Sequence, residues 1–154
     1  MYHALSCVEK MMENQEKKIV LGVITKLRLA QNVIFFAQYH TNFWVRMICQ
    51  RVLGHIFAAS IENKGSNLTQ MLGLDIPEQL LDFSFNLVKC LNKQVFNEEM
   101  RNQIVKNLIF MLNTLLEQKG KKPDISSLFK KISFIGRKLM LDIKTAGDRL
   151  ETIL

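Results

Sequence analysis

The amino-acid sequence predicts an all-α protein of about six helices, arranged as about three helix pairs in an open α-solenoid. Hydrophobic residues make up 48% of the 154-residue chain, and only two prolines and seven glycines interrupt it. Apolar residues recur at spacings of three and four, which is the periodicity of helices that bury one face. With about 20 residues per helix and short loops, the chain has room for about six helices.

Two helices are expected within the first 38 residues. The first spans residues 2–14 and carries Leu5, Val8 and Met12 on one side. The second is expected to run unbroken from about Ile19 to Gln38, because its apolar residues keep a helical spacing. These residues are expected to face the interior, and they are Ile19, Val23, Leu27, Ala30 and Ile34.

A third helix follows a short break at residues 40–43, where Asn42 is well suited to cap the helix. Its apolar stripe has a spacing of about four and consists of Trp44, Ile48, Val52, Ile56 and Ala59. Three polar residues, Arg46, Gln50 and Arg51, lie outside this stripe. Trp44 is expected to pack into the neighbouring helix pair, with the role of an anchor for a partner as the alternative.

Residues 62–74 are the longest loop expected, a possible break in an otherwise single segment spanning residues 1–154. This stretch contains Gly65, Ser66, Asn67 and Gly73. A fourth helix is expected to begin after it, because Asp75 can cap the first turn, Pro77 needs no N–H partner there and Glu78 can close a capping box. Its apolar residues are Leu80, Phe83, Leu87 and Leu91.

The last two helices also have recognisable starts. Asn97 can cap the fifth helix, and the two glutamates after it suit the positive end of the helix dipole. Its stripe is Ile104, Leu108, Leu112 and Leu115, and Gly120 and Pro123 are expected to end it. The sixth helix is expected over residues 126–146 and turns inward Leu128, Ile132, Ile135, Leu139 and Ile143.

Six helices in sequence are compatible with a closed bundle or with an open stack of helix pairs. Internal repetition between the pairs is weak, so periodicity does not decide between the two. The apolar faces are wide on nearly every helix, more than one small bundle core requires. This favours the open stack.

Catalytic and ligand-binding motifs are missing from the sequence. The three histidines, His3, His40 and His55, fall on different expected elements, and the dispersed glycines form no phosphate-binding loop. The cysteines are an odd number without a CxxC pair, and we expect them to pack in the core: Cys7, Cys49 and Cys90. We therefore expect no enzyme activity, cofactor, metal or small-molecule substrate.

No apolar run reaches the roughly 18 residues of a membrane span, so no membrane partner is expected.

Positive charge is concentrated in the last third of the chain. The net charge is +7, and residues 119–144 hold eight basic and two acidic residues, a local charge of 8 − 2 = +6. On the sixth helix Lys130, Arg137 and Lys144 recur every seven residues, with Lys131 and Lys138 beside them. The predicted RNA- or partner-binding residues are Lys119, Lys121, Lys122, Lys130, Lys131, Arg137, Lys138 and Lys144.

Two roles for this basic surface remain open. Such a stripe can follow a phosphate backbone, releasing counterions and making affinity depend steeply on salt. It could equally be a solvated face that only keeps the protein soluble. No aromatic stripe is interleaved with these lysines, so contact with the nucleic-acid backbone or shape is expected rather than single-strand base stacking.

Three stretches resemble the C-terminal region of the giant HEAT-repeat subunit of the small-subunit processome, the down-regulated-in-metastasis (DRIM) family. The first is Trp44-Val-Arg with His40 upstream, followed by Leu53-Gly-His-Ile-Phe-Ala58. The second and most specific is Gln103-Ile-Val-Lys-Asn-Leu-Ile-Phe110, and the third is Leu128-Phe-Lys-Lys-Ile-Ser-Phe-Ile-Gly-Arg-Lys138. Thr41 and Asn42 stand where the family has Pro and His, and the match fades after Lys138.

The resemblance implies a nucleolar, HEAT-like α-solenoid that acts as a scaffold in small-subunit ribosomal RNA processing. Its partners would be pre-ribosomal RNA or ribonucleoprotein and other ribosome-assembly proteins. The alternative is a HEAT-type protein–protein adaptor with no direct RNA contact. The resemblance assigns structural roles to motif residues His40, Trp44, Val45, Arg46, Gly54, Phe57, Gln103, Val105, Lys106 and Asn107.

Overall fold

A computed structural model describes residues 1–14, 17–62, 72, 77–94, 97–117 and 124–153 of the protein. These residues form helices and no strand, so the predicted all-α class is confirmed. The helices are α1 (Tyr2–Glu13), α2 (Lys17–Lys26), α3 (Leu29–Tyr39), α4 (Phe43–Glu62), α6 (Pro77–Lys93), α7 (Glu98–Glu117) and α8 (Ser126–Ile153).

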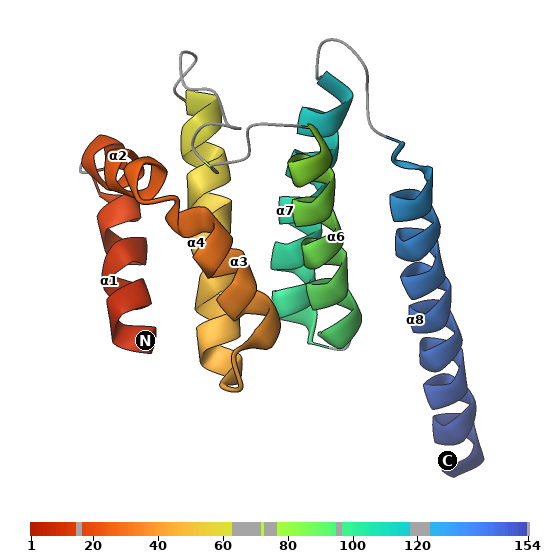
Figure 1. Cartoon of the computed structure of the whole chain (residues 1–154). Helices are drawn as coiled ribbons and strands as arrows, with labels where there is room; N and C mark the ends of the chain where they lie inside the picture. Colours follow the sequence, from red (N-terminus) through yellow and green to blue (C-terminus); the bar gives the residue numbers. More distant parts are fainter. Residues whose placement is uncertain (15–16, 63–71, 73–76, 95–96, 118–123, 154) are drawn as a thin grey trace.

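The helices cross the molecule in groups that follow the chain, from α1 and α2 at one side, through the α3–α4 pair and the α6–α7 pair, to α8 at the other (Figure 1). Both α1 and α3 pack on α4, and α6 packs on α7. The α3–α4 and α6–α7 pairs are joined through contacts of α4 with α7 and of α3 with α6. At the far side, α8 packs along α6.

Side-chain caps start the helices where the sequence predicts them. The Asn42 side-chain oxygen accepts from the backbone N–H groups of Trp44 at 2.8 Å and Val45 at 3.3 Å. The Asn97 side-chain oxygen likewise accepts from Met100 N–H at 2.9 Å. Ahead of α8, Asp124 accepts from Ser126 N–H at 2.9 Å. Each cap satisfies donors that have no partner inside the helix.

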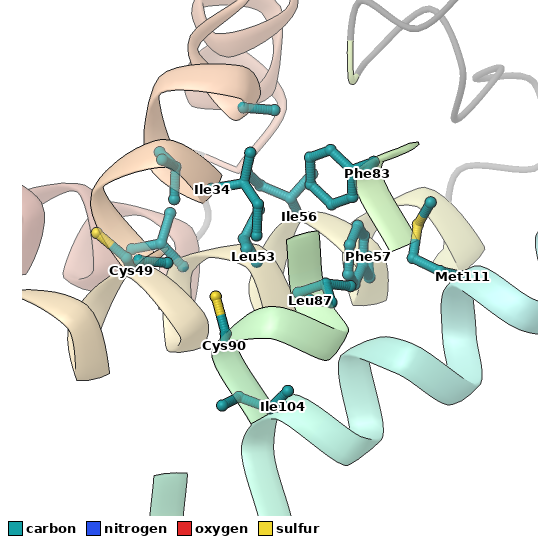
Figure 2. Close-up of a cluster of buried hydrophobic side chains, with 14 of the residues drawn as sticks. Ile34, Cys49, Leu53, Ile56, Phe57, Phe83, Leu87, Cys90, Ile104 and Met111 are labelled. Atoms are coloured by element: carbon teal, nitrogen blue, oxygen red, sulfur yellow. The ribbon is translucent and has the colours of Figure 1, made fainter. Parts of the chain in front are cut away.

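The core forms where α3, α4, α6 and α7 meet (Figure 2). Most residues of the predicted stripes of α4, α6 and α7 are buried there, and Phe57 stacks on Phe110 with ring centroids 4.7 Å apart. The labelled members in Figure 2 are Ile34, Cys49, Leu53, Ile56, Phe57, Phe83, Leu87, Cys90, Ile104 and Met111. Burial of this apolar surface is the main force that stabilises the fold.

The predicted unbroken helix over residues 19–38 is wrong, and the helix count rises to seven in the described part of the chain. Arg28 takes a left-handed conformation (φ 50°, ψ 37°), and the helices on either side of it meet at 84°. On the N-terminal side of this turn, α2 packs against the core through Val20 and Ile24. Three residues predicted to face inward are exposed instead: Ile19 (72%) and Val23 (47%) in α2, and Leu27 (59%) just after it.

Three further expectations about side-chain burial are wrong. Trp44 is 61% exposed although Val45, in the same first turn of α4, is 3% exposed, so Trp44 points away from the helices packed on α4. Gln50, expected outside the stripe, is fully buried because α7 covers that side of α4. Cys7 is exposed on α1, whereas Cys49 and Cys90 are in the core as expected.

Several expected features lie outside the described residues. They include Asp75, Gly120, Pro123 and the loop at residues 62–74, of which only Leu72 and the last residue of α4, Glu62, are described. Leu72 is fully buried. The helix expected over residues 126–146 reaches Ile153, but the side chains of Leu139 and Ile143 are not described.

Within the described chain, no single helix has the length and hydropathy of a membrane span, although α2 and α3 together pass that test as a bent pair.

Candidate nucleic-acid interface

Four of the eight predicted basic site residues lie together on the exposed face of α8: Lys130, Lys131, Arg137 and Lys138. Lys144 is also in α8, but its side chain is not described, and Lys119, Lys121 and Lys122 fall outside the described residues. The structure therefore brings together half of the predicted set.

The basic residues of α8 form two rows separate from the buried face of the helix. Leu128 and Ile135 are 0% and 5% exposed and hold α8 in place. At about 100° per residue, Lys130 and Arg137 point about 140–180° away from these two residues. Lys131 and Lys138 form a second row about 60–80° from Leu128, at the edge of the contact with α6.

A groove of about 380 Å³ lies between α6 and α8, beside these rows. Val88 and Ile135, which are 3% and 5% exposed, contribute its apolar floor. The Lys131 ammonium lies over the Phe85 ring, 4.8 Å from its centroid. The complete lining is Phe85, Val88, Lys89 and Asn92 from α6 and Lys130, Lys131, Phe134 and Ile135 from α8.

Sequence reasoning missed the α6 side of this groove and the aromatic residue on α8. Phe134 follows Lys130 by four residues and Lys131 by three, so helical spacing alone could have placed it beside both lysines. No pattern in the sequence indicated that residues of α6 would line this groove. Lys89 and Lys130 are distant in the sequence, and only the packing of the two helices brings them to one groove.

The first and second family-like stretches meet where α4 packs on α7. Asn107 donates through its side-chain nitrogen to the backbone oxygen and the side-chain oxygen of Gln50, both at 3.0 Å. Gln103 in turn donates to the Asn107 oxygen at 3.2 Å. Gly54 faces this pair so closely that a Cβ atom there would lie 2.5 Å from the Gln103 nitrogen.

Other residues of the two stretches fall into inward and outward sets. Phe57 and Asn107 are buried, whereas Lys106 is exposed and Val105 is 37% exposed. The buried contacts fix the spacing of α4 and α7 and leave Lys106 at the surface. These interactions hold two helices together and present no reactive group.

The turn between α3 and α4 is closed by residues of the first stretch. His40 accepts from Asn42 N–H at 3.0 Å through its Nδ1 atom. The Arg46 guanidinium donates to the backbone oxygens of His40 at 2.8 Å and Thr41 at 2.9 Å. Val45 is buried, and its neighbour Trp44 points into solvent. His40 and Arg46 thus shape this turn.

A charged cluster between α1 and α4 was not predicted. Arg51 donates to both carboxylate oxygens of Glu9, at 2.6 and 2.7 Å, and His55 Nε2 lies 3.7 Å from one oxygen each of Glu9 and Glu13. Hydrogen bonding from Arg51 is the main reason that the pKa of Glu9 is lowered. The i, i+4 spacing of Glu9 with Glu13 and of Arg51 with His55 was the available signal.

This cluster lines a second cavity, of about 570 Å³, together with motif residues of α4 and α7. The ligand atoms of Glu9, Glu13 and His55 lie within 4.8 Å of one another, a spacing that could hold a metal ion. Both Glu9 oxygens already accept from Arg51, however, and the guanidinium opposes a second cation there. The arrangement works as an ion-pair network that holds α1 on α4.

No protein-family model, curated protein or solved structure matches this chain. What the residues of α8 and its groove can do therefore follows from their own chemistry.

Proposed function

We propose that this protein is a non-catalytic helical-repeat scaffold that binds pre-ribosomal RNA or ribonucleoprotein during small-subunit ribosomal RNA processing. The observation that carries the RNA role is the exposed double row of cations on α8, Lys130, Lys131, Arg137 and Lys138, on faces that the core does not use. Cations held in rows on a rigid helix can contact successive phosphates. The ribosomal and nucleolar part comes from the resemblance of the three stretches to the DRIM family.

The packing order supports an open, HEAT-like stack for this scaffold. Each helix pair contacts the next pair along the chain, α3–α4 against α6–α7, and α8 continues the series on α6. Stacking of this kind leaves long surfaces for partners, which is how helical-repeat proteins bind extended molecules.

A HEAT-type protein–protein adaptor without RNA contact is the second candidate. It is favoured by aromatic side chains exposed on α3 and at the start of α4: Phe35 (56%), Tyr39 (55%) and Trp44 (61%). Aromatic residues of this kind are enriched at the centres of protein interfaces. This function would be supported if the protein captured ribosome-assembly proteins after nuclease treatment and if a Trp44→Ala variant failed to capture them.

The RNA role is tested by neutralising the four described cations of α8 together, as Lys130→Gln, Lys131→Gln, Arg137→Gln and Lys138→Gln. We expect weaker binding to RNA. The plot of the logarithm of the affinity against the logarithm of the salt concentration should also become less steep by up to about 3, since each lost phosphate contact removes about 0.7 from this slope for a single strand. The measurement is fluorescence anisotropy of labelled RNA over a series of salt concentrations.

A matched control carries the same change in charge elsewhere on the surface. Lys10, Lys18, Lys26 and Lys106 are all exposed and lie away from α8. Their replacement by Gln should leave the salt dependence close to that of the wild-type protein. Equal losses in the two variants would mean that only net charge matters, and the RNA role of α8 would then be rejected.

A further inference from the structure

We propose that the groove between α6 and α8 holds an unpaired nucleotide base stacked on Phe134, so that the RNA bound by α8 is single-stranded there. This inference rests on the proposed RNA-binding function and specifies the form of RNA that the surface takes. It departs from the expectation, drawn from the sequence, that the lysines contact the nucleic-acid backbone or shape and that no base stacks on this surface.

Phe134 is an aromatic side chain placed in water among cations. Its ring is 63% exposed, although it belongs to a helix with a well-buried face. At about 100° per residue, it points between the Lys130–Arg137 row and the Lys131–Lys138 row, about 40–60° from each. An aromatic ring flanked by cations is the arrangement with which proteins bind single strands, since bases stack on the ring and phosphates pair with the cations.

The groove next to Phe134 has the size and the lining that a base requires. Its volume of about 380 Å³ lies within the range of roughly 300–1,000 Å³ that is usual for small-molecule sites. Val88 and Ile135 give it an apolar floor for the flat face of a base. Asn92 at the rim carries an amide that can both donate to and accept from the edge of a base.

A base can enter this groove only when it is unpaired. In a duplex the faces of the bases are stacked on one another and their edges are paired, so a side chain reaches mainly phosphates and sugars. Lys89 and Lys130 stand at the groove and can hold the phosphates on either side of an extruded base. The site therefore distinguishes a single strand from a duplex.

An acidic peptide with an aromatic side chain is the main competing ligand. The cations of α8 do not stop at the groove, because Arg137 and Lys138 repeat the Lys130–Lys131 pair two turns, or about 10.5 Å, further on. An RNA strand presents a phosphate and a base on every unit, so one strand can pair with successive cations and also place a base at Phe134, whereas an acidic peptide has a ring only at its aromatic residue. This favours RNA.

Stacking is tested directly with a Phe134→Trp variant in a Trp44→Phe background, which carries one indole because Trp44 is the only tryptophan of the chain. Three probes are compared: a short oligouridylate, an abasic ribose-phosphate strand of the same length, and a perfectly paired RNA duplex. We expect only the oligouridylate to quench the indole emission at concentrations at which all three probes are bound. Equal quenching by the abasic strand or the duplex would overturn the proposal.

Affinity is measured in the otherwise wild-type chain with Phe134→Ala. Loss of one stacked base should weaken oligouridylate binding by about five- to 150-fold and leave the salt dependence unchanged, since no charge is removed. Phe129→Ala is the matched control, because Phe129 is also an exposed phenylalanine of α8 (44%) but lies outside the groove. Both side chains are exposed rather than part of the core, so neither variant should unfold the protein.

The remaining outcomes separate this inference from the proposed function. If the fourfold charge variant loses RNA while Phe134→Ala binds normally, α8 holds RNA but stacks no base, and this inference is wrong. If the wild-type protein binds no RNA, both proposals are wrong. If an oligoglutamate peptide containing one tyrosine quenches the indole and oligouridylate does not, the groove is a peptide site.

Discussion

Gly54 and the two side chains opposite it determine how closely α4 and α7 approach. Gly54 has no side chain, and this leaves room for the Gln103 amide, which donates to Asn107, which in turn donates to Gln50. None of these contacts could be inferred from helical periodicity, which treats polar residues of a helix as solvent-facing. The buried Gln50 shows the consequence, since its side-chain oxygen enters the core where Asn107 of another helix donates to it, although its side-chain nitrogen has no partner there.

The close approach at Gly54 can be measured by a double-mutant cycle. Gly54→Ala alone should change the free energy of unfolding by less than about 0.5 kcal/mol, because the gain in helix propensity is offset by displacement of the Gln103 amide. In a Gln103→Ala background the Gly54→Ala change should raise the free energy of unfolding by about 1 kcal/mol, because the gain in helix propensity is then not offset. Urea unfolding of the four proteins gives the coupling. Equal effects in both backgrounds would mean that Gln103 does not fill this space.

The Glu9–Arg51 ion pair gives the protein a defined acid sensitivity. The folded-state pKa of Glu9 is lowered below its ordinary value of 4.5, so its stabilisation is fully present above pH 4.5 and is lost as the pH falls through the folded-state value. Glu9→Gln should cost about 1–2 kcal/mol at pH 7, a modest figure because the Arg51 side chain is 37% exposed. The difference from the wild-type protein should shrink below pH 4.5.

Urea unfolding at several pH values checks this, with Glu13→Gln as the control. Glu13 is 56% exposed and lies 3.7 Å from His55 with no bidentate partner, so its replacement should cost less than about 0.5 kcal/mol. A constant difference between wild-type and Glu9→Gln proteins down to acidic pH would contradict the lowered pKa.

Helix by helix, the sequence was informative about starts and less so about breaks. Asn42 and Asn97 were predicted as caps, and both accept from the first turn of the following helix, because a cap is a local interaction. The break at Arg28 has no comparable signal, since neither glycine nor proline is present and the apolar spacing continues across it. The left-handed conformation is set by how α2 and α3 pack, which periodicity does not report.

The cap of α7 provides the test at this level. Asn97→Ala should lower the free energy of unfolding by about 1 kcal/mol, because the N–H of Met100 loses its acceptor. Asn97→Asp keeps the acceptor and adds a negative charge at the positive end of the helix dipole, so it should be neutral or slightly stabilising. Thermal and urea unfolding of both variants measure the effect, and equal losses would contradict the capping role.

Across the whole molecule, the helical class and most of the core were predictable, and the surfaces between helices were not. The stripes of α4, α6 and α7 are buried largely as expected because each needs only the period of one helix. The α6–α8 groove joins Phe85 to Phe134, which are far apart in the sequence, and so depends on the packing partner of α8. The cations of α8 were predicted from the sequence as one stripe, whereas their division into two rows and the groove beside them were not predicted.

The reactivity of the three thiols reports on the integrity of the whole core. Cys49 and Cys90 are buried, and burial raises the pKa of each thiol to about 12, so neither forms a thiolate at pH 8. Cys7 is exposed on α1. A thiol reagent should therefore titrate one cysteine in the native protein and three in urea, and Cys7→Ser should remove the fast reaction. Rapid reaction of two or three thiols in the native state would contradict this core.

The turn at Arg28 also affects how the N-terminal part exchanges its amide hydrogens with solvent. Because the chain bends there, α2 is anchored through one side only, and its residues Ile19 and Val23 are exposed. Its backbone amides can therefore open by a small local fluctuation, whereas those of α4 and α7 open only when the core itself is disrupted. Deuterium should consequently enter α2 well before it enters α4, so that the slowest-exchanging part of the protein is the α4–α7 contact.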